Sequence, residues 1–140
     1  DMSIFEDYIE IKTSKNAFAG LLGIRPLEMR EGYARGEMDF RPSFGNSMGT
    51  VHGGVIFSLA DTVSGLAAAS YGFQSSTVSA SMNYLKAGKN PAKLSAEANT
   101  VKHGKTLSVI EVEVTDDRGV LLAKGTFTYY NLGIPLVKED

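Results

Sequence analysis

The most regular pattern of apolar and polar positions lies in the middle of the chain and is helical. From Gly54 to about Tyr71, apolar residues recur at the three- and four-residue spacing of a helix that buries one face. The spacing therefore predicts one long helix here. Its buried face is expected to consist of Ile56, Leu59, Ala60, Val63, Leu66 and Ala67.

The opposite face of this predicted helix is small and polar. It carries Gly54, Ser58, Asp61, Thr62 and Gly65. A helix face in contact with solvent normally carries several lysine, glutamate or arginine side chains. This face has a single charged side chain, and the helix is rich in Ala, Ser and Gly, so we expect another element to approach its backbone closely.

A shorter helix and a hairpin are predicted before it. Asn16 can accept a hydrogen bond as the N-terminal cap of a helix, and Gly23 can end that helix. The chain from Ile24 to Met38 then alternates loosely between apolar and polar residues and turns at Glu31-Gly32. This alternation around a turn indicates an antiparallel hairpin.

After Gly72 the residue pattern becomes typical of β-strands. Four segments are rich in β-branched and aromatic residues, and short breaks rich in turn-forming residues separate them. Because the breaks are short, we expect consecutive strands to pair antiparallel. A hairpin, a helix and four strands predict an α+β fold, with one helix against an antiparallel sheet, as a single domain over residues 1–140. The predicted strands are Val78–Leu85, Lys93–Lys102, Thr106–Thr115 and Val120–Tyr130.

Composition and charge narrow the possible functions. The chain has 140 residues, no cysteine and two histidines, which excludes a disulfide framework, a thiolate metal site, a cysteine nucleophile and a histidine-rich metal cluster. Its net charge of -2 produces no global attraction for nucleic acid. No segment has the roughly 18 apolar residues that a membrane-spanning helix needs. The acidic N-terminal residues lack the order of a signal peptide, so the expected location is the cytoplasm.

Asp61 is the candidate for acid–base or nucleophilic chemistry. It is the only formally charged side chain between Arg41 and Lys86, and it lies too far into the predicted helix to cap the N-terminus. A lone carboxylate in an apolar stretch is a candidate general base or nucleophile. The alternative is a carboxylate that faces solvent or pairs with a distant lysine.

His52-Gly53-Gly54 stands at the start of the same helix. Two glycines there leave backbone N–H groups unobstructed at the positive end of the helix dipole, where an anion or a carbonyl oxygen gaining negative charge can bind. The alternative is an ordinary N-terminal turn. His52 is either a base or, as we favour, a residue whose side chain fixes this loop by a hydrogen bond.

Basic residues gather between Lys86 and Lys105, a stretch in which Glu97 is the only acidic residue. Such a bias predicts either lysines that protect the edges of the sheet or a rim that binds phosphate groups. The stretch has no interleaved aromatic platform, so a small polyphosphate ligand fits better than nucleic acid. The basic residues are Lys86, Lys89, Lys93, Lys102, His103 and Lys105.

Together these features resemble the hotdog-fold thioesterases, most closely the phenylacetyl-CoA thioesterase type. The segment from Asn46 to Thr62, with its His-Gly-Gly and Asp61, carries the resemblance, and residues 84–88, 102–105 and 123–126 extend it. The resemblance covers about residues 16–130. It implies a hotdog fold, in which a long central helix is wrapped by an antiparallel sheet, and an assembly into dimers or dimers of dimers.

The resemblance also implies a reaction, the hydrolysis of an acyl-CoA thioester with a small aromatic or a short- to medium-chain acyl group. The Gly54 N–H would polarise the thioester carbonyl, and Gly53 would shape the turn. Asp61 would act as nucleophile or as general base for water, although related branches have glutamate at this position. Asn46 matches a family position that places the water or the thioester, and His52 is a further catalytic candidate.

The same resemblance suggests substrate-binding residues. Ser79 lies where some relatives use a hydroxyl, and the basic stretch would receive the phosphates of CoA. No metal or redox cofactor is implied. The alternative function is a non-catalytic module that binds or senses acyl-CoA on the same fold. The predicted phosphate contacts are Lys86, Lys102, His103, Gly104 and Lys105.

The spacing of Gly54 and Asp61 predicts an active site that is shared between two chains. An α-helix rises about 1.5 Å per residue, so these two residues lie roughly 10 Å apart along the axis. One helix therefore cannot place both on the same thioester group. Two antiparallel copies of the helix in a two-fold dimer would combine them, so we expect a homodimer, or a dimer of dimers, with shared sites.

Overall fold

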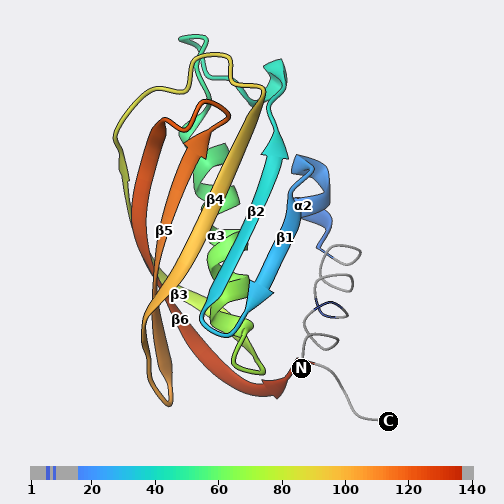
Figure 1. Ribbon diagram of the computed structural model, residues 1–140, viewed down its shortest axis with the longest axis vertical. Helices are drawn as coiled ribbons and strands as arrows, with labels where there is room; N and C mark the ends of the chain where they lie inside the picture. The colour runs from blue at the N-terminus through green and yellow to red at the C-terminus, as the bar shows by residue number, and fades with distance from the viewer. Residues whose placement is uncertain (1–5, 7, 9–15, 137–140) are drawn as a thin grey trace.

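One antiparallel sheet and one long helix make up most of the structure. The computed structural model describes residues 6, 8 and 16–136. Among these, six strands form a sheet in the order β1-β2-β4-β5-β6-β3, which curves around α3 (Figure 1). The elements are α2 (Ala17–Leu22), β1 (Arg25–Arg30), β2 (Tyr33–Asp39), a 3₁₀ turn (Pro42–Phe44), α3 (Gly53–Ala69), β3 (Phe73–Tyr84), β4 (Lys93–His103), β5 (Leu107–Asp116) and β6 (Leu121–Pro135).

The long helix α3 buries the face that the sequence predicts. The predicted core residues on this face are at most 3% exposed. They belong to one apolar core with inward-facing residues of the sheet such as Met38, Ile110 and Phe127. The predicted α+β fold, with one helix against an antiparallel sheet, is therefore confirmed. No helix in the described part of the chain is long and apolar enough to cross a membrane.

The short helix and the hairpin before α3 also form as predicted. Asn16 Oδ1 accepts a hydrogen bond from the Ala19 N–H at 3.1 Å and caps α2. Gly23 ends this helix with a φ of 74°, a conformation that glycine adopts without steric cost. Strands β1 and β2 pair antiparallel on either side of Glu31-Gly32.

The expectation that consecutive strands pair is wrong for β3. This strand begins at Phe73, before the predicted Val78, and pairs with β6 at the edge of the sheet. Strand β4 lies between β2 and β5 instead. The reason is that residues 85–92 do not reverse the chain into a hairpin. They cross the loop before α3, where the Val51 N–H donates to the Gly88 carbonyl at 2.9 Å. The chain therefore passes from the edge strand β3 to the position of β4, between β2 and β5.

Candidate active site

Asp61 lies in the middle of α3 and lines a pocket of about 170 Å³. The pocket lies between α3, strands β3 and β6, and the segment that contains α2 and the start of β1. Its apolar wall includes Ala19, Ile24 and Leu66. The Asp61 residue is half-buried. A carboxylate at the border of a partly apolar pocket is a candidate for acid–base or nucleophilic chemistry.

Two hydroxyl groups hold one oxygen of the Asp61 carboxylate. Thr77 Oγ1 donates to Asp61 Oδ1 at 2.9 Å. The Tyr129 hydroxyl lies 2.7 Å from the same oxygen and 2.8 Å from the backbone carbonyl oxygen of Asp61, so its one proton has two acceptors on this residue. Thr77 and Tyr129 are direct cross-strand partners on β3 and β6, so the sheet register brings both hydroxyls to one place. Within the described residues, no lysine or arginine forms an ion pair with Asp61.

The sequence pattern did not identify Thr77 or Tyr129 as residues of this site. The Tyr129 side chain is 3% exposed. Burial, together with the charge of Asp61, raises the pKa of Tyr129 far above its usual range, so its hydroxyl remains a hydrogen-bond donor. The period of two along β6, with Phe127 also buried, indicates that Tyr129 points inward. A buried tyrosine hydroxyl usually has a partner, but only the packing of β6 on α3 shows that this partner is Asp61.

A second group of predicted site residues lies at the N-terminus of α3. His52 is its cap, and the ring Nδ1 accepts a hydrogen bond from the Gly54 N–H at 2.8 Å. His52 therefore makes a loop-fixing contact, and the N–H that was expected to polarise a carbonyl binds His52 in this structure. Gly53 lies against Tyr84: a Cβ at Gly53 would be 3.3 Å from a ring carbon, and the Tyr84 hydroxyl donates to the Gly53 carbonyl at 3.1 Å.

Asn46 shapes the loop that leads into α3. Its Oδ1 accepts hydrogen bonds from the N–H groups of Met48 and Thr50, both at 3.0 Å. Its Nδ2 donates to Thr50 Oγ1 at 2.8 Å. Asn46, Gly53 and Lys86 line a second pocket, of about 320 Å³. The structure therefore brings these predicted site residues together at the start of α3.

In a single chain, the Asp61 pocket and the pocket at the start of α3 are separate. Of the residues that the structure describes, none lines both the Asp61 pocket and the pocket at the start of α3. Gly54 and Asp61 lie on the same straight element, with almost two turns of helix between them. No group of three or more potential metal-ligating side chains gathers anywhere in the described part of the chain.

Ser79 makes no hydrogen bond to Asp61 in the described part of the chain, whereas Thr77 does. The two residues would share a face in a regular strand, but β3 has a bulge between them. Ser79 is exposed, and it is not among the described residues that line either pocket. Its role in substrate binding stays a prediction.

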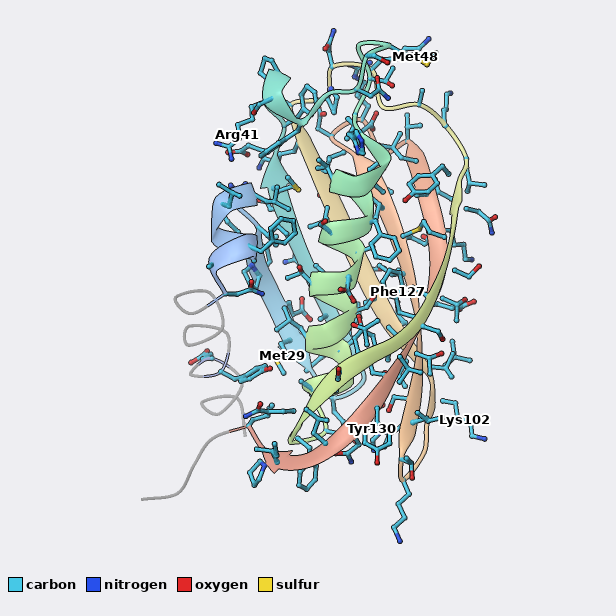
Figure 2. The ribbon with its side chains drawn as sticks, turned by 180° about the vertical axis from the view of Figure 1, so that it is seen from behind. Met29, Arg41, Met48, Lys102, Phe127 and Tyr130 are labelled. Carbon is cyan, nitrogen blue, oxygen red and sulfur yellow. The ribbon has the colours of Figure 1, made fainter. Side chains whose placement is uncertain are left out.

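The predicted phosphate contacts lie at opposite ends of α3. Lys86 lines the pocket at the start of α3. His103 lies beyond the other end of this helix, where its ring stacks on Tyr71 with the centroids 3.6 Å apart and its Nδ1 lies 2.8 Å from Ser108 Oγ. Figure 2 shows Lys102 at the end of the molecule opposite Met48, which belongs to the loop before α3.

Comparison with known proteins identifies the class of protein to which this chain belongs. Residues 48–123, more than half of the chain, match the thioesterase superfamily. They include α3 with both Gly54 and Asp61. The chain belongs to the thioesterase superfamily, and its predicted class of enzyme, a thioester hydrolase, is confirmed.

Individual relatives and solved structures agree with this family. A relative from Archaeoglobus fulgidus is 41% identical over 117 residues, which cover 82% of this chain and 76% of the relative. The acyl-coenzyme A thioesterase PaaI of Escherichia coli is 31% identical over 103 residues, or 74% of each chain.

The solved structure of the E. coli PaaI protein, from the phenylacetic acid degradation operon, superimposes with a TM-score of 0.90 at 26% identity, over 95% of this chain and 96% of PaaI. A Streptococcus mutans protein solved with acetyl CoA reaches a TM-score of 0.76 at 34% identity, over 80% of this chain and 90% of its own. The predicted hotdog fold and the resemblance to phenylacetyl-CoA thioesterases are therefore confirmed.

Proposed function

We propose that the chain hydrolyses an acyl-CoA thioester to the free acid and CoA, with a small aromatic or a short- to medium-chain acyl group. The observation that carries this proposal is the half-buried Asp61 carboxylate, which lines a partly apolar pocket and has one oxygen held by Thr77 and Tyr129. The E. coli relative is named an acyl-coenzyme A thioesterase, and the S. mutans structure holds acetyl CoA. Both support CoA as the thiol part of the substrate.

The reaction needs one positioned carboxylate and one donor to the carbonyl oxygen. As a general base, Asp61 takes a proton from water, the water oxygen bonds to the carbonyl carbon, the carbon–sulfur bond breaks, and the CoA sulfur receives the proton. As a nucleophile, Asp61 bonds to the carbonyl carbon and displaces CoA, and water then hydrolyses the anhydride and supplies the proton for CoA. In both routes the Gly54 N–H would bind the developing oxyanion, once the His52 ring has moved from it.

In this proposal the complete site lies between two chains. One chain keeps the Asp61 pocket apart from the pocket at the start of α3. Strand β3 is an edge strand with mostly exposed residues, and its Val78 is 57% exposed. A long exposed edge strand with apolar side chains favours pairing with a second chain. A two-fold dimer, alone or in a dimer of dimers, would place the Asp61 pocket of one protomer beside the start of α3 in its partner.

The position of the basic residues supports the same arrangement. Lys86 lies at the start of α3, and residues 102–105 lie beyond its other end. With the two helices antiparallel, the 102–105 turn of one protomer would lie toward the start of α3 in the other. The two groups would then form one rim for the phosphates of CoA.

A second candidate function is binding of acyl-CoA without hydrolysis, as in a sensing module. The observation that favours it is the hydrogen bond from the Gly54 N–H to His52 Nδ1. This bond occupies the donor that a developing oxyanion would need. The Asp61 carboxylate favours hydrolysis, because a binding module has no use for a free carboxylate beside a thioester.

The test is a panel of acyl-CoAs, with the released thiol measured by a disulfide dye. Asp61→Asn should lower kcat by at least about a hundredfold, as expected on removal of a positioned base or nucleophile. Glu111→Gln, a matched change at an exposed position of β5, should leave kcat unchanged. Thiol release by Asp61→Asn at more than about a tenth of the wild-type rate contradicts the catalytic role of Asp61. Binding of acyl-CoA with no thiol release by the wild type supports the sensing module.

A further inference from the structure

The two oxygens of the Asp61 carboxylate have different surroundings. Oδ1 accepts hydrogen bonds from the hydroxyls of Thr77 and Tyr129, at 2.9 and 2.7 Å, and the Tyr129 hydroxyl also lies 2.8 Å from the Asp61 carbonyl oxygen. No residue in the described part of the chain donates to Oδ2. Within the described residues, the carboxylate is therefore held through one oxygen only, and both donors are neutral.

Tyr129 is the more firmly held of the two donors. Its backbone lies between two neighbouring strands, opposite Thr77 on β3 and opposite Ser108 on β5. Its ring lies against α3 at Gly65, where a Cβ would be 3.8 Å from a ring carbon. Thr77, in contrast, is exposed on the edge strand. The Tyr129 hydroxyl thus reaches Asp61 from a fixed position in the sheet.

The Tyr129 hydroxyl also keeps its proton. Burial, and next the charge of Asp61, raise the pKa of Tyr129 far above its usual range. Hydrogen bonds to a charged acceptor are stronger than those between neutral groups. Loss of this donor would let the carboxylate rotate, because only the exposed Thr77 would still hold Oδ1.

We propose that Tyr129 is a positioning residue for Asp61, which binds Oδ1, fixes the plane of the carboxylate and leaves Oδ2 as the oxygen that acts on water or on the thioester. This role rests on the proposed function, since it assigns Asp61 to the reaction. Tyr129 lies beyond residues 48–123, which match the thioesterase superfamily, so the family match does not assign it.

The first test compares two tyrosine-to-phenylalanine changes. Tyr129→Phe should lower kcat by about tenfold or more, the range expected for a lost hydrogen bond to a charged group. Its KM should stay within about twofold of the wild-type value, because the carboxylate acts mainly in the transition state. Tyr33→Phe is the matched control. The Tyr33 hydroxyl donates to Glu97 at 2.7 Å at an exposed position, so this variant loses an equivalent bond far from the pocket and should keep the wild-type kcat.

The second test needs no substrate. The ¹³C signal of the Asp61 carboxyl carbon is recorded in an equal mixture of light and heavy water. In the wild type, hydrogen and deuterium on the Tyr129 hydroxyl should split this signal, and the splitting should persist in Thr77→Val, where Tyr129 is the remaining donor to Oδ1. Tyr129→Phe should lose the splitting, and Tyr33→Phe should keep it. A merely structural loss of active enzyme would not remove the splitting.

These measurements separate the two proposals. If the wild type hydrolyses acyl-CoA while Tyr129→Phe keeps the wild-type kcat and the splitting, the positioning role is overturned and the proposed function stands. If no thioester of the panel is hydrolysed, the proposed function fails, and the NMR data alone test the contact between Tyr129 and Asp61. An Asp61 signal that does not split in mixed water then overturns this contact, whereas a splitting that Thr77→Val keeps supports it. The splitting is measured on the wild type and on Thr77→Val, so it remains available if Tyr129→Phe does not fold.

Discussion

Mixing two inactive variants tests whether one active site is built from two chains. Asp61→Asn removes the carboxylate and nearly keeps its size. Gly54→Pro removes the N–H at the start of α3, in the first turn, where proline is tolerated. A Cβ at Gly54 would be 3.0 Å from His52 Nδ1, so the proline ring displaces an exposed side chain and leaves the backbone in place.

The expected size of the effect follows from how the two defects combine. Each variant alone should lose about a hundredfold or more of kcat, through the lost carboxylate or the lost donor to the oxyanion. Random exchange of equal amounts yields mixed dimers as half of the population. A mixed dimer has one site with both defects and one site with neither, so about half of one half, or a quarter, of wild-type activity should return.

The assay is thiol release from the best acyl-CoA before and after subunit exchange. One variant carries heavy isotopes, so native mass spectrometry measures the fraction of mixed dimers directly. Each variant incubated with itself is the control for exchange, and circular dichroism checks that both are folded. A mixture that contains mixed dimers by mass and still releases no thiol would refute the shared site.

Two further predictions concern substrate binding and stability. Lys102→Ala combined with Lys105→Ala should raise KM for CoA esters more than it lowers kcat. Phosphate contacts far from the carbonyl stabilise the bound substrate and the transition state equally. Equal KM values for a CoA ester and its N-acetylcysteamine analogue would contradict this prediction. Leu59→Ala, at a position that is 0% exposed, should lower the free energy of unfolding in urea by about 2–5 kcal/mol. Leu21→Ala, at 67% exposed, should cost about 0.5 kcal/mol or less, and similar losses for both variants would contradict the core assignment.

Local physical chemistry made the helices and the first hairpin predictable from the sequence. The buried face of α3 follows from apolar spacing alone, because a helix has one period whatever it packs against. The ends of α2 follow from Asn16 and Gly23, since both act within one turn of the backbone. The candidate site was predictable to the same extent, because Asp61 is the single charged residue of the helix and Gly53 and Gly54 stand at its start.

The partners of β3 and of Asp61 could not be predicted in this way. Strand β3 pairs with β6 because residues 85–92 cross the loop before α3, and the short break in the sequence gives no sign of that path. The contacts of Thr77 and Tyr129 with Asp61 depend in turn on this pairing, which places the two hydroxyls opposite each other.

Sequence by itself therefore determined the elements of this protein, the face that α3 buries and the residue with a lone charge, since these depend on neighbours within a few positions. Tertiary structure alone decided which strand pairs with β3 and which hydroxyls hold the Asp61 carboxylate. The physical reason is that a hydrogen bond forms between atoms about 3 Å apart in space, whatever their separation along the chain.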